Sequence, residues 1–275
     1  MHIEENNIAV QGVTPFLKWA GGKRWLAETC LELFPKKFNT YIEPFLGGGA
    51  MFFRLMPERA VLADMNRELI ETYSAIASDH RAVSRKIKKY HDLHSFDRYY
   101  EIRAEVPKKT VDVAARFIYL NRTCWNGLYR VNRKGQFNVP IGTKTNVVLD
   151  SDDWPAISGA LGKAKLYVSD FEPIVDRASN GDLVFADPPY TVKHNNNGFV
   201  KYNENIFAWN DQIRLRDALL RAKMRGAFVF CTNADHQSIW ELYRDDFSIV
   251  RVNRSSVISG KSQYRGATSE LLIYS

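Results

Sequence analysis

Short apolar runs alternate with helix-forming segments along most of this chain, and this alternation limits the folds that the chain can adopt. Each run is followed by loop residues, and the runs are 41–45, 60–63, 166–168, 183–186, 227–231, 247–252 and 271–274. Helix-forming segments such as Gln212–Lys223 and Gln237–Tyr243 lie between many of them. Strands that alternate with helices predict an α/β fold with an open, mostly parallel sheet. The last two runs predict an antiparallel pair at the edge of that sheet.

One long stretch interrupts this rhythm, because residues 68–162 contain little strand signal. Residues 68–121 are mostly helix-forming and carry many Lys, Arg, Glu and aromatic side chains, whereas residues 122–150 are rich in Asn, Gly and Arg. We therefore predict an α/β domain formed by residues 1–67 and 163–275. A helical domain, residues 68–162, is inserted between its second and third strands.

The most informative motif is Asp187-Pro188-Pro189-Tyr190, which directly follows the apolar run Leu183–Ala186. An acid, two prolines without N–H groups and an aromatic ring at the end of a strand can hold a flat ring that carries an amine. The carboxylate and a prolyl carbonyl accept hydrogen bonds from the amine, and the tyrosine stacks on the ring. The alternative is a proline turn that closes the strand, with Asp187 as an ordinary turn residue.

Glycines follow the first predicted strand in the segment Glu43–Ala50 (EPFLGGGA). Glycines at a strand-to-helix turn let a ligand approach the backbone and leave the N-terminus of the helix open. The second strand ends at Asp64, seventeen residues after Gly47. An acid at this place is positioned to hold ribose hydroxyls. The alternative for Asp64 is the N-cap of the next helix.

A second glycine turn, Lys18–Lys23 (KWAGGK), precedes the first strand. It is not a phosphate-binding P-loop, because that motif needs Gly at the position of Leu17 and Ser or Thr at the position of Arg24. ATP hydrolysis therefore loses its main support. Lys23 can instead meet the carboxylate of a cofactor that resembles an amino acid, or it can be a solvated surface lysine. Trp19 can equally be a core aromatic.

The charge distribution permits a polyanionic partner but does not demand one. The formal net charge is +7, and residues 116–144 hold no acid. The basic side chains of that stretch are Arg116, Arg122, Arg130, Arg133, Lys134 and Lys144. The three cysteines, Cys30, Cys124 and Cys231, are scattered, so they predict neither a disulfide framework nor a metal site. A reducing cytoplasm suits this pattern.

Taken in order along the chain, these motifs resemble the Dam- and DpnII-type DNA adenine methyltransferases of the alpha group of amino-methyltransferases. The order is Lys18–Lys23, Glu43–Ala50, the helical insertion and then Asp187–Tyr190. The most specific parts are residues 120–130 (LNRTCWNGLYR) and 135–142 (GQFNVPIG). The resemblance extends from about Phe16 to the C-terminus. It implies a Rossmann-like methyltransferase sheet, with residues 68–162 as the target-recognition domain.

The resemblance implies S-adenosylmethionine as the methyl donor and assigns residues to it. The positions that match cofactor contacts are Trp19, Lys23, Glu43, Phe45, Gly47, Gly49, Asp64, Asp170, Phe171 and Asp187. Asp170 resembles the acid that binds the amine of the cofactor's adenine, with Phe171 beside it. Asp187, Pro188 and Tyr190 match the catalytic positions that hold the target adenine.

The resemblance also implies duplex DNA as the partner. The positions that match DNA contacts are Lys18, Asn121, Arg122, Trp125, Asn126, Leu128, Arg130, Asn138 and Pro140. Trp125 and Asn126 match residues that wedge into the duplex where the adenine leaves. Arg130 matches an arginine that recognises a guanine, and its alternative is a phosphate contact. Thr143 stands where the Dam pattern has an arginine on a flanking phosphate, with Lys144 beside it.

The resulting hypothesis is a site-specific DNA methyltransferase that modifies the N6 amine of an adenine flipped out of duplex DNA, in the sequence GATC. Asp187 and the Pro188 carbonyl accept the hydrogens of the amine, and direct transfer then requires neither a metal nor a nucleophilic Cys or Ser. Three alternatives stay open. They are a catalytically silent regulator that binds DNA and S-adenosylmethionine, an enzyme with a different target sequence, and an enzyme of the same class that acts on a cytosine amine or on RNA. We expect a cytoplasmic protein, held at the nucleoid by DNA, with no obligatory protein partner.

Overall fold

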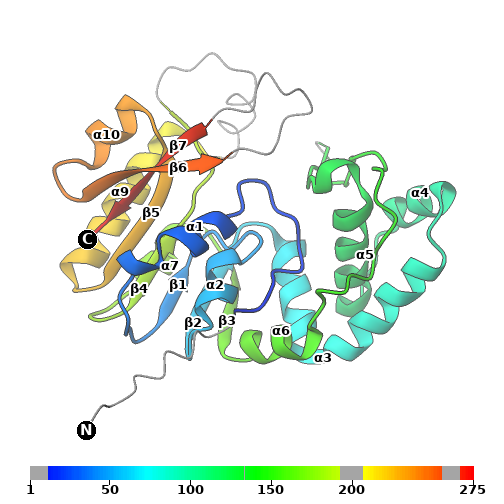
Figure 1. Cartoon of the computed structure of the whole chain (residues 1–275). Coiled ribbons are helices and arrows are strands. Elements are labelled where there is room, and N and C mark those ends of the chain that lie inside the picture. The colour runs from blue at the N-terminus through cyan, green and yellow to red at the C-terminus, as the bar shows by residue number, and fades with distance from the viewer. Residues whose placement is uncertain (1–11, 133, 193–206, 256–266) are drawn as a thin grey trace, which may run out of the picture. The chain divides into compact units, whose positions relative to one another are not determined.

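The computed structural model describes residues 12–132, 134–192, 207–255 and 267–275, and its strands form one sheet (Figure 1). The strands are β1 Tyr41–Glu43, β2 Ala60–Asp64, β3 Ala164–Val168, β4 Leu183–Ala186, β5 Phe228–Ala234, β6 Ser248–Ser255 and β7 Ala267–Tyr274. Their order across the sheet is β3-β2-β1-β4-β5-β7-β6. Within the described ranges no helix is long and apolar enough to span a membrane.

The pairing of the strands confirms the predicted mostly parallel sheet with an antiparallel edge. β2, β1, β4 and β5 pair in parallel, and Ile42 of β1 lies opposite Val61 on one side and Val184 on the other. β7 is antiparallel to both β5 and β6. β6 and β7 form the predicted antiparallel pair at the edge, with β6 outermost. The buried segment Glu270–Ile273 of β7 matches an inner strand that is covered on both faces.

β1 and β4 are inner strands, and the order of the sheet reverses between them. Every residue of both strands is buried, as expected of parallel strands that helices cover on both faces. From this pair the sheet continues to β2 and β3 in one direction and to β5, β7 and β6 in the other. In an open α/β sheet, ligands bind beyond the carboxyl ends of the strands at such a switch point.

The contacts between residues divide the chain into two compact units. The sheet unit comprises residues 28–46, 59–66 and the described residues from 165 onward. The helical unit comprises residues 12–27, 47–58 and 67–164. The whole turn Lys18–Lys23 therefore belongs to the helical unit. Of the turn Glu43–Ala50, residues 47–50 belong to the helical unit and residues 43–46 to the sheet unit. The assignment of residues 68–162 to target recognition stays a prediction.

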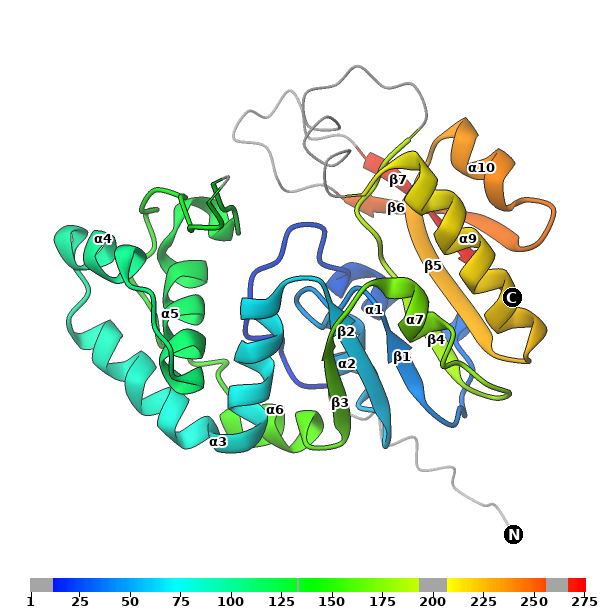
Figure 2. The ribbon, with the colours of Figure 1, turned by 180° about the vertical axis from the view of Figure 1, so that it is seen from behind.

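Helices of the sheet unit enclose its apolar core. They are η1 Leu31–Leu33, α7 Phe171–Val175, α9 Trp209–Met224 and α10 Gln237–Tyr243. α7 and α9 cover the face of the sheet that Figure 2 turns toward the viewer. Val184, Leu219 and Val229 are fully buried in the core on this side. Phe34, directly after η1, stacks on Phe230 of β5 with ring centroids 4.1 Å apart.

The helical unit is organised around one buried helix. Its helices are α2 Ala50–Leu55, α3 Arg67–Asp92, α4 Phe96–Ala104, α5 Thr110–Thr123, η2 Trp125–Gly127 and α6 Trp154–Leu161. Helix α1, Arg24–Thr29, contains the boundary between the two units. α5 is buried without a break from Val113 to Thr123. α3 bends at Asp79 (φ −151°, ψ 73°), whose carboxylate accepts the Ala82 N–H and so starts a second helical piece. The end of α5 is therefore a fixed support for the residues that follow it.

Candidate functional site

Four acids lie at the carboxyl ends of four neighbouring strands of the sheet unit. Glu43 is the last residue of β1 and Asp64 the last of β2. Asp187 directly follows β4, and Asp170 follows β3 after one residue. The Ser169 N–H donates to the Asp64 carbonyl at 3.3 Å, which joins the ends of β3 and β2. Parallel pairing thus gathers acids that are far apart in the sequence along one edge. No three His, Cys, Asp or Glu side chains of the described residues lie close enough to hold a metal ion.

The side chains of Asp187 and Tyr190 are each held by a neighbouring strand. The Thr232 hydroxyl of β5 donates to Asp187 Oδ1 at 2.6 Å. The Tyr190 hydroxyl donates to Glu270 Oε2 of β7 at 2.7 Å. Thr232 is fully buried and Glu270 is 7% exposed. Sequence reasoning missed both partners, because Thr232 and Glu270 lie 45 and 80 residues along the chain from the side chains that they hold.

Two tyrosines beside these acids stay neutral. Burial, followed by the charges of Asp187 and Glu270, raises the pKa of the Tyr190 phenol well above its usual value, and the Thr232 hydroxyl opposes this rise. Burial raises the pKa of Tyr41 in the same way, with Glu43 as the next cause. The Tyr41 hydroxyl donates to Glu43 Oε2 at 2.9 Å. Each phenol therefore keeps its proton and uses it to hold an acid.

Aromatic rings line the region beyond β1. Phe45 stacks on Phe171 with ring centroids 5.4 Å apart and meets Phe207 edge-on at 5.7 Å. Phe171 is buried, at the N-terminus of α7. Phe45 and Phe171 lie close in the chain to Glu43 and Asp170, and an apolar wall with acids near it suits a flat heterocycle with polar edges.

Asp64 shapes the chain at the end of β2 and does not cap α3. Its Oδ1 accepts the Asn66 N–H at 2.9 Å, whereas α3 begins at Arg67. The side chain therefore closes a turn two residues long, the type of turn that aspartate commonly forms. Asp64 is half-buried, so its carboxylate is partly open to solvent at the edge of the sheet.

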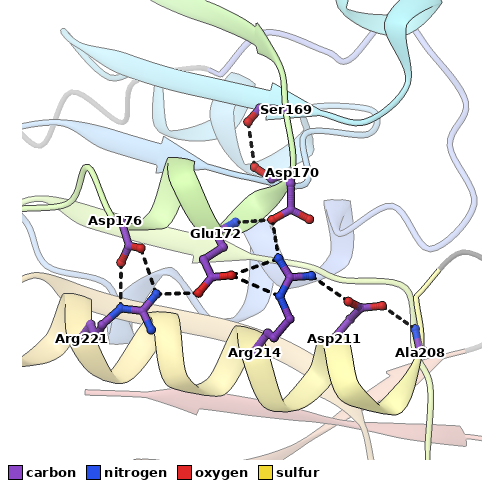
Figure 3. A network of polar contacts seen from close by, with 8 residues as sticks. All are labelled: Ser169, Asp170, Glu172, Asp176, Ala208, Asp211, Arg214 and Arg221. Atoms are coloured by element: carbon purple, nitrogen blue, oxygen red, sulfur yellow. Dashed lines mark hydrogen bonds and ion pairs between the residues drawn. The ribbon is translucent and has the colours of Figure 1, made fainter.

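Asp170 belongs to a network of ion pairs between α7 and α9 (Figure 3). Its Oδ1 accepts the Glu172 N–H at 3.0 Å, which caps α7, and a guanidinium N–H of Arg214 at 2.9 Å. The same guanidinium lies 4.8 Å from the ring of Phe171. The other carboxylate oxygen of Asp170 makes no hydrogen bond to a described residue. Sequence reasoning missed Arg214, because a basic residue on an amphipathic helix gives no signal of its own.

Glu172 connects this network to a second arginine. Hydrogen bonds from Arg221 and then from Arg214 lower the pKa of the Glu172 carboxyl, and Arg221 also pairs with Asp176 at 2.9 Å. The side chains of Asp170 and Arg214 are 40% and 42% exposed. Exposed ion pairs contribute only about 0–1 kcal/mol each, so the network sets the geometry of Asp170 more than the stability of the fold.

In the helical unit, the glycine turn at Gly47 is packed against Trp19. A Cβ at Gly47 would lie 2.7 Å from Trp19 Cδ1, and the φ of +47° is itself one that favours glycine. The Tyr73 hydroxyl donates to the Gly47 carbonyl at 3.0 Å. Trp19 also stacks with Phe117 and Tyr129, at centroid distances of 6.3 and 6.0 Å. The glycine that was expected to admit a ligand thus admits an indole ring, and Gly49 (φ +65°) follows as the N-cap of α2.

Lys23 is buried, with 3% of the residue exposed, so it is not a solvated surface lysine. Its Nζ donates to the Gly21 carbonyl at 2.7 Å. Gly21 has a φ of +77°, and this turn directs its carbonyl back toward the lysine that follows. The KWAGGK segment therefore holds a cation inside the helical unit.

Several predicted DNA contacts share an exposed surface at the end of α5. Trp125 is 52% exposed and Leu128 is 42% exposed, and Asn126 between them has a positive φ of 55°. Lys18 and Pro140 are also exposed. The Trp125 N–H donates to the Pro140 carbonyl at 2.9 Å, so the backbone beneath these side chains is fixed.

Arg130 and Asn138 pair across a hairpin in which Val131 bridges Phe137. Arg130 Nε donates to Asn138 Oδ1 at 2.9 Å, and the Asn138 N–H donates to the Arg130 carbonyl at 3.1 Å. Arg130 is exposed. Arg130 Nη2 also donates to the Asn138 backbone carbonyl at 3.5 Å, so Asn138 orients the guanidinium through both its side chain and its main chain.

Asn121 and Arg122 were expected to contact DNA, but the structure buries both. The Asn121 amide accepts the Lys18 N–H at 2.9 Å and donates to the Lys18 carbonyl at 2.8 Å. The Arg122 side chain is 2% exposed and forms a two-pronged pair with Asp152 at 2.5 and 2.7 Å. Neither group reaches the surface, because α5 is covered on all sides. Both hold neighbouring segments in place instead.

Comparison with known proteins shows which family the chain resembles. Residues 19–258 match the sequence profile of the D12 class N6 adenine-specific DNA methyltransferases. The type II methyltransferase M1.LlaDCHI of Lactococcus lactis subsp. cremoris is 36% identical, over 98% of this chain and 97% of the relative. The type II methyltransferase M.MjaIII of Methanocaldococcus jannaschii is 33% identical, over 95% and 98%. The DNA adenine methylase of Vibrio cholerae is 32% identical, over 94% of each.

Proposed function

Because the chain belongs to the D12 class N6 adenine-specific DNA methyltransferase family, we propose that it transfers a methyl group from S-adenosylmethionine to the N6 amine of an adenine flipped out of duplex DNA in GATC. Membership makes the chain an adenine-specific DNA methyltransferase with double-stranded DNA as its substrate class. The observation that carries the finer proposal is the Asp187 carboxylate, held by Thr232 at the end of β4 next to the switch point of the sheet.

The adenine amine is a weak nucleophile because its lone pair is delocalised into the ring. Asp187 and the Pro188 carbonyl accept the hydrogens of the amine, which favours a tetrahedral nitrogen whose lone pair is directed at the methyl group. The carboxylate also stabilises the positive charge that develops on this nitrogen. Tyr190 stacks on the base, and its hydrogen bond to Glu270 fixes the plane of its ring.

The acids and rings at the ends of β1, β2 and β3 fit the polar groups of S-adenosylmethionine. Asp170 accepts the amine of the cofactor's adenine, and Phe45 and Phe171 form an apolar wall for that base. Asp64 accepts ribose hydroxyls, and Glu43 supplies negative charge for the cationic part of the molecule. When bound, the cofactor supplies an electrophilic methyl group.

Four residues of the helical unit also belong to the proposed cofactor contacts. Lys23 is held as a buried cation, which suits the carboxylate of S-adenosylmethionine because a buried charge favours an opposite charge. Gly47 and Gly49 lie in the turn that resembles the family's glycine motif, and Trp19 packs against Gly47.

The exposed end of α5 suits entry into a duplex. Trp125 is 52% exposed and can therefore reach a partner; in the proposal it fills the gap that the flipped adenine leaves, while Asn126 satisfies the orphaned thymine. Arg130 places two donors on a guanine edge in the major groove, which contributes about 1–3 kcal/mol of discrimination. The further base contacts that we propose are Lys18, Leu128 and Pro140.

The three remaining residues that were predicted to contact DNA instead support other parts of the proposed DNA-binding surface. Asn121 fixes the main chain of Lys18, Arg122 fixes the segment at Asp152, and Asn138 orients the Arg130 guanidinium. This division of roles follows from burial, because a guanidinium that is enclosed by protein cannot reach a phosphate.

One assay tests the proposal. Duplex oligonucleotides of equal composition, one with GATC and one with a scrambled site, are incubated with S-adenosylmethionine labelled in its methyl group and digested to nucleosides. We expect labelled N6-methyladenine from the GATC duplex alone. Asp187→Asn preserves the shape of the side chain but removes the charge, so we expect methyl transfer to fall by at least about 100-fold with unchanged thermal unfolding and DNA binding.

Each other result of that assay refutes a stated part of the proposal. Label in both duplexes contradicts recognition of GATC. Label on cytosine contradicts the adenine target. No label in any DNA contradicts methyl transfer and favours a silent regulator, and an active Asp187→Asn variant contradicts the role of Asp187.

A further inference from the structure

The end of β5 lies directly beside the Asp187–Tyr190 motif. β4 and β5 pair in parallel up to Ala186 opposite Cys231, so Asp187, which directly follows β4, comes beside Thr232 of β5. The Thr232 hydroxyl donates to Asp187 Oδ1 at 2.6 Å, within the range of a hydrogen bond from a hydroxyl to a carboxylate. Thr232 is fully buried, so water does not compete for its hydroxyl.

The same side chain also acts on Tyr190. Burial, Asp187 and Glu270 raise the pKa of the Tyr190 phenol, and the Thr232 side chain opposes this rise. The residue that holds Asp187 therefore also influences Tyr190, the second side chain that is proposed to hold the adenine. Glu270 fixes the phenol from the opposite direction through β7.

The residue after Thr232 holds the other end of the motif. Successive side chains of a strand point to opposite faces, and Asn233 Nδ2 donates to Gln212 Oε1 of α9 at 3.0 Å. Gln212 Nε2 in turn donates to the carbonyl of Thr191, the residue that follows Tyr190, at 3.3 Å. Asn233 and Gln212 are both fully buried. Consecutive residues of β5 thus hold the beginning and the end of the motif.

We propose that Thr232 is a positioning residue for methyl transfer, because its hydroxyl holds the Asp187 carboxylate in the orientation that accepts the amine of the target adenine. This inference rests on the proposed function, in which Asp187 is that acceptor. An ionised carboxylate offers about four lone-pair sites, so a bond from Thr232 leaves acceptor capacity for the amine. The bond restricts the terminal torsion of aspartate, which is broad in the absence of a partner.

Thr232→Val tests this directly, because valine has nearly the same shape and lacks the hydroxyl. We expect kcat for methylation of the GATC duplex to fall by about 10- to 100-fold, since an orientation error of about 1 Å is worth up to about 100-fold. We expect KM for S-adenosylmethionine and for DNA to stay at the wild-type value, because Thr232 is fully buried. Thr232→Ser restores the hydroxyl and most of the rate. If Thr232→Val does not fold, Thr232→Ala takes its place with the same expectation.

Thr72→Val is a matched control. Thr72 is also fully buried, and its hydroxyl donates to a backbone carbonyl, that of Glu68, at 2.7 Å. We expect this variant to retain the wild-type kcat, so the same chemical change costs rate only next to Asp187.

The outcomes separate this inference from the proposed function. An inactive wild-type chain contradicts the proposed function itself. An active wild type with an inactive Asp187→Asn and a wild-type kcat in Thr232→Val contradicts the inference alone. A Thr232→Val variant that raises KM at constant kcat also contradicts it, as does a Thr232→Ser variant as slow as Thr232→Val.

Discussion

The end of the sheet and the end of α5 hold their functional side chains in opposite ways. At the sheet, the acids and phenols are bonded to other buried side chains, as in Asp187 with Thr232 and Tyr190 with Glu270. At α5, Trp125 and Leu128 are exposed, and what is fixed is the backbone beneath them, through the bond from the Trp125 N–H to the Pro140 carbonyl.

This difference matches two different tasks. Charge that develops during a reaction is stabilised best by groups that are already oriented, so the reacting end is built from buried side-chain bonds. Reading a duplex requires side chains that reach outward, so the support has to come from the backbone and from buried residues below. A change at the sheet should therefore alter rate, a change on the exposed surface should alter specificity, and a change in the buried support should alter stability.

The largest expected effect on stability comes from Arg122→Ala in the buried support of α5. The variant leaves the Asp152 carboxylate, which is 4% exposed, without its two-pronged partner. Removing one member of a buried ion pair costs about 3–5 kcal/mol. We expect the free energy of unfolding, measured with urea, to fall by this amount.

The control for Arg122 is the double variant Arg122→Ala with Asp152→Ala. It removes the charge that the single variant leaves unpaired, so it should be more stable than Arg122→Ala alone. If Arg122→Ala unfolds as the wild type does but loses affinity for DNA, the guanidinium contacts DNA after all and the support role is wrong.

An intermediate effect is expected from Arg130→Ala on the exposed surface. Because the guanidinium is exposed, the free energy of unfolding stays unchanged, whereas discrimination between GATC and sites altered at one guanine falls by about 1–3 kcal/mol. Competition between oligonucleotides in the methylation assay measures this. Asn138→Ala keeps the guanidinium but removes the bond to Nε, so we expect a smaller loss in the same direction. An equal loss on cognate and unrelated DNA would identify Arg130 as a phosphate contact.

Much of the fold could be predicted because its signals are local. The apolar runs that became β1, β2, β4 and β5 are buried strands, and the motif Asp187–Tyr190 follows β4 as the sequence indicates. The position of β7 between β5 and β6 could not be predicted, because strand order depends on contacts between distant segments. For the same reason Thr232 and Glu270 were missed, since they lie 45 and 80 residues from their partners.

The roles of basic and amide side chains were the least predictable. Asn121 and Arg122 follow the apolar stretch Phe117–Leu120 on the same helix, and that position indicates burial better than their polarity indicates a DNA contact. Lys23 was compatible with a solvated side chain, yet it is enclosed. Residue type alone does not give exposure, because a buried charge becomes acceptable once partners from elsewhere in the chain surround it.

The smallest effect is expected from Arg214→Ala. This variant tests whether the burial of a neighbouring side chain decides how strongly that side chain holds an acid of the site. Arg214 holds Asp170 as Thr232 holds Asp187, but its ion pair is about two-fifths exposed. An exposed pair is worth at most about 1 kcal/mol, so we expect KM for S-adenosylmethionine to rise by no more than about fivefold at constant kcat. Arg221→Ala is the matched control, because Arg221 contacts Glu172 and Asp176 but not Asp170, and it should leave KM unchanged. A rise in KM as large as the expected loss of kcat in Thr232→Val would mean that geometry, and not burial, decides how strongly a neighbour fixes an acid.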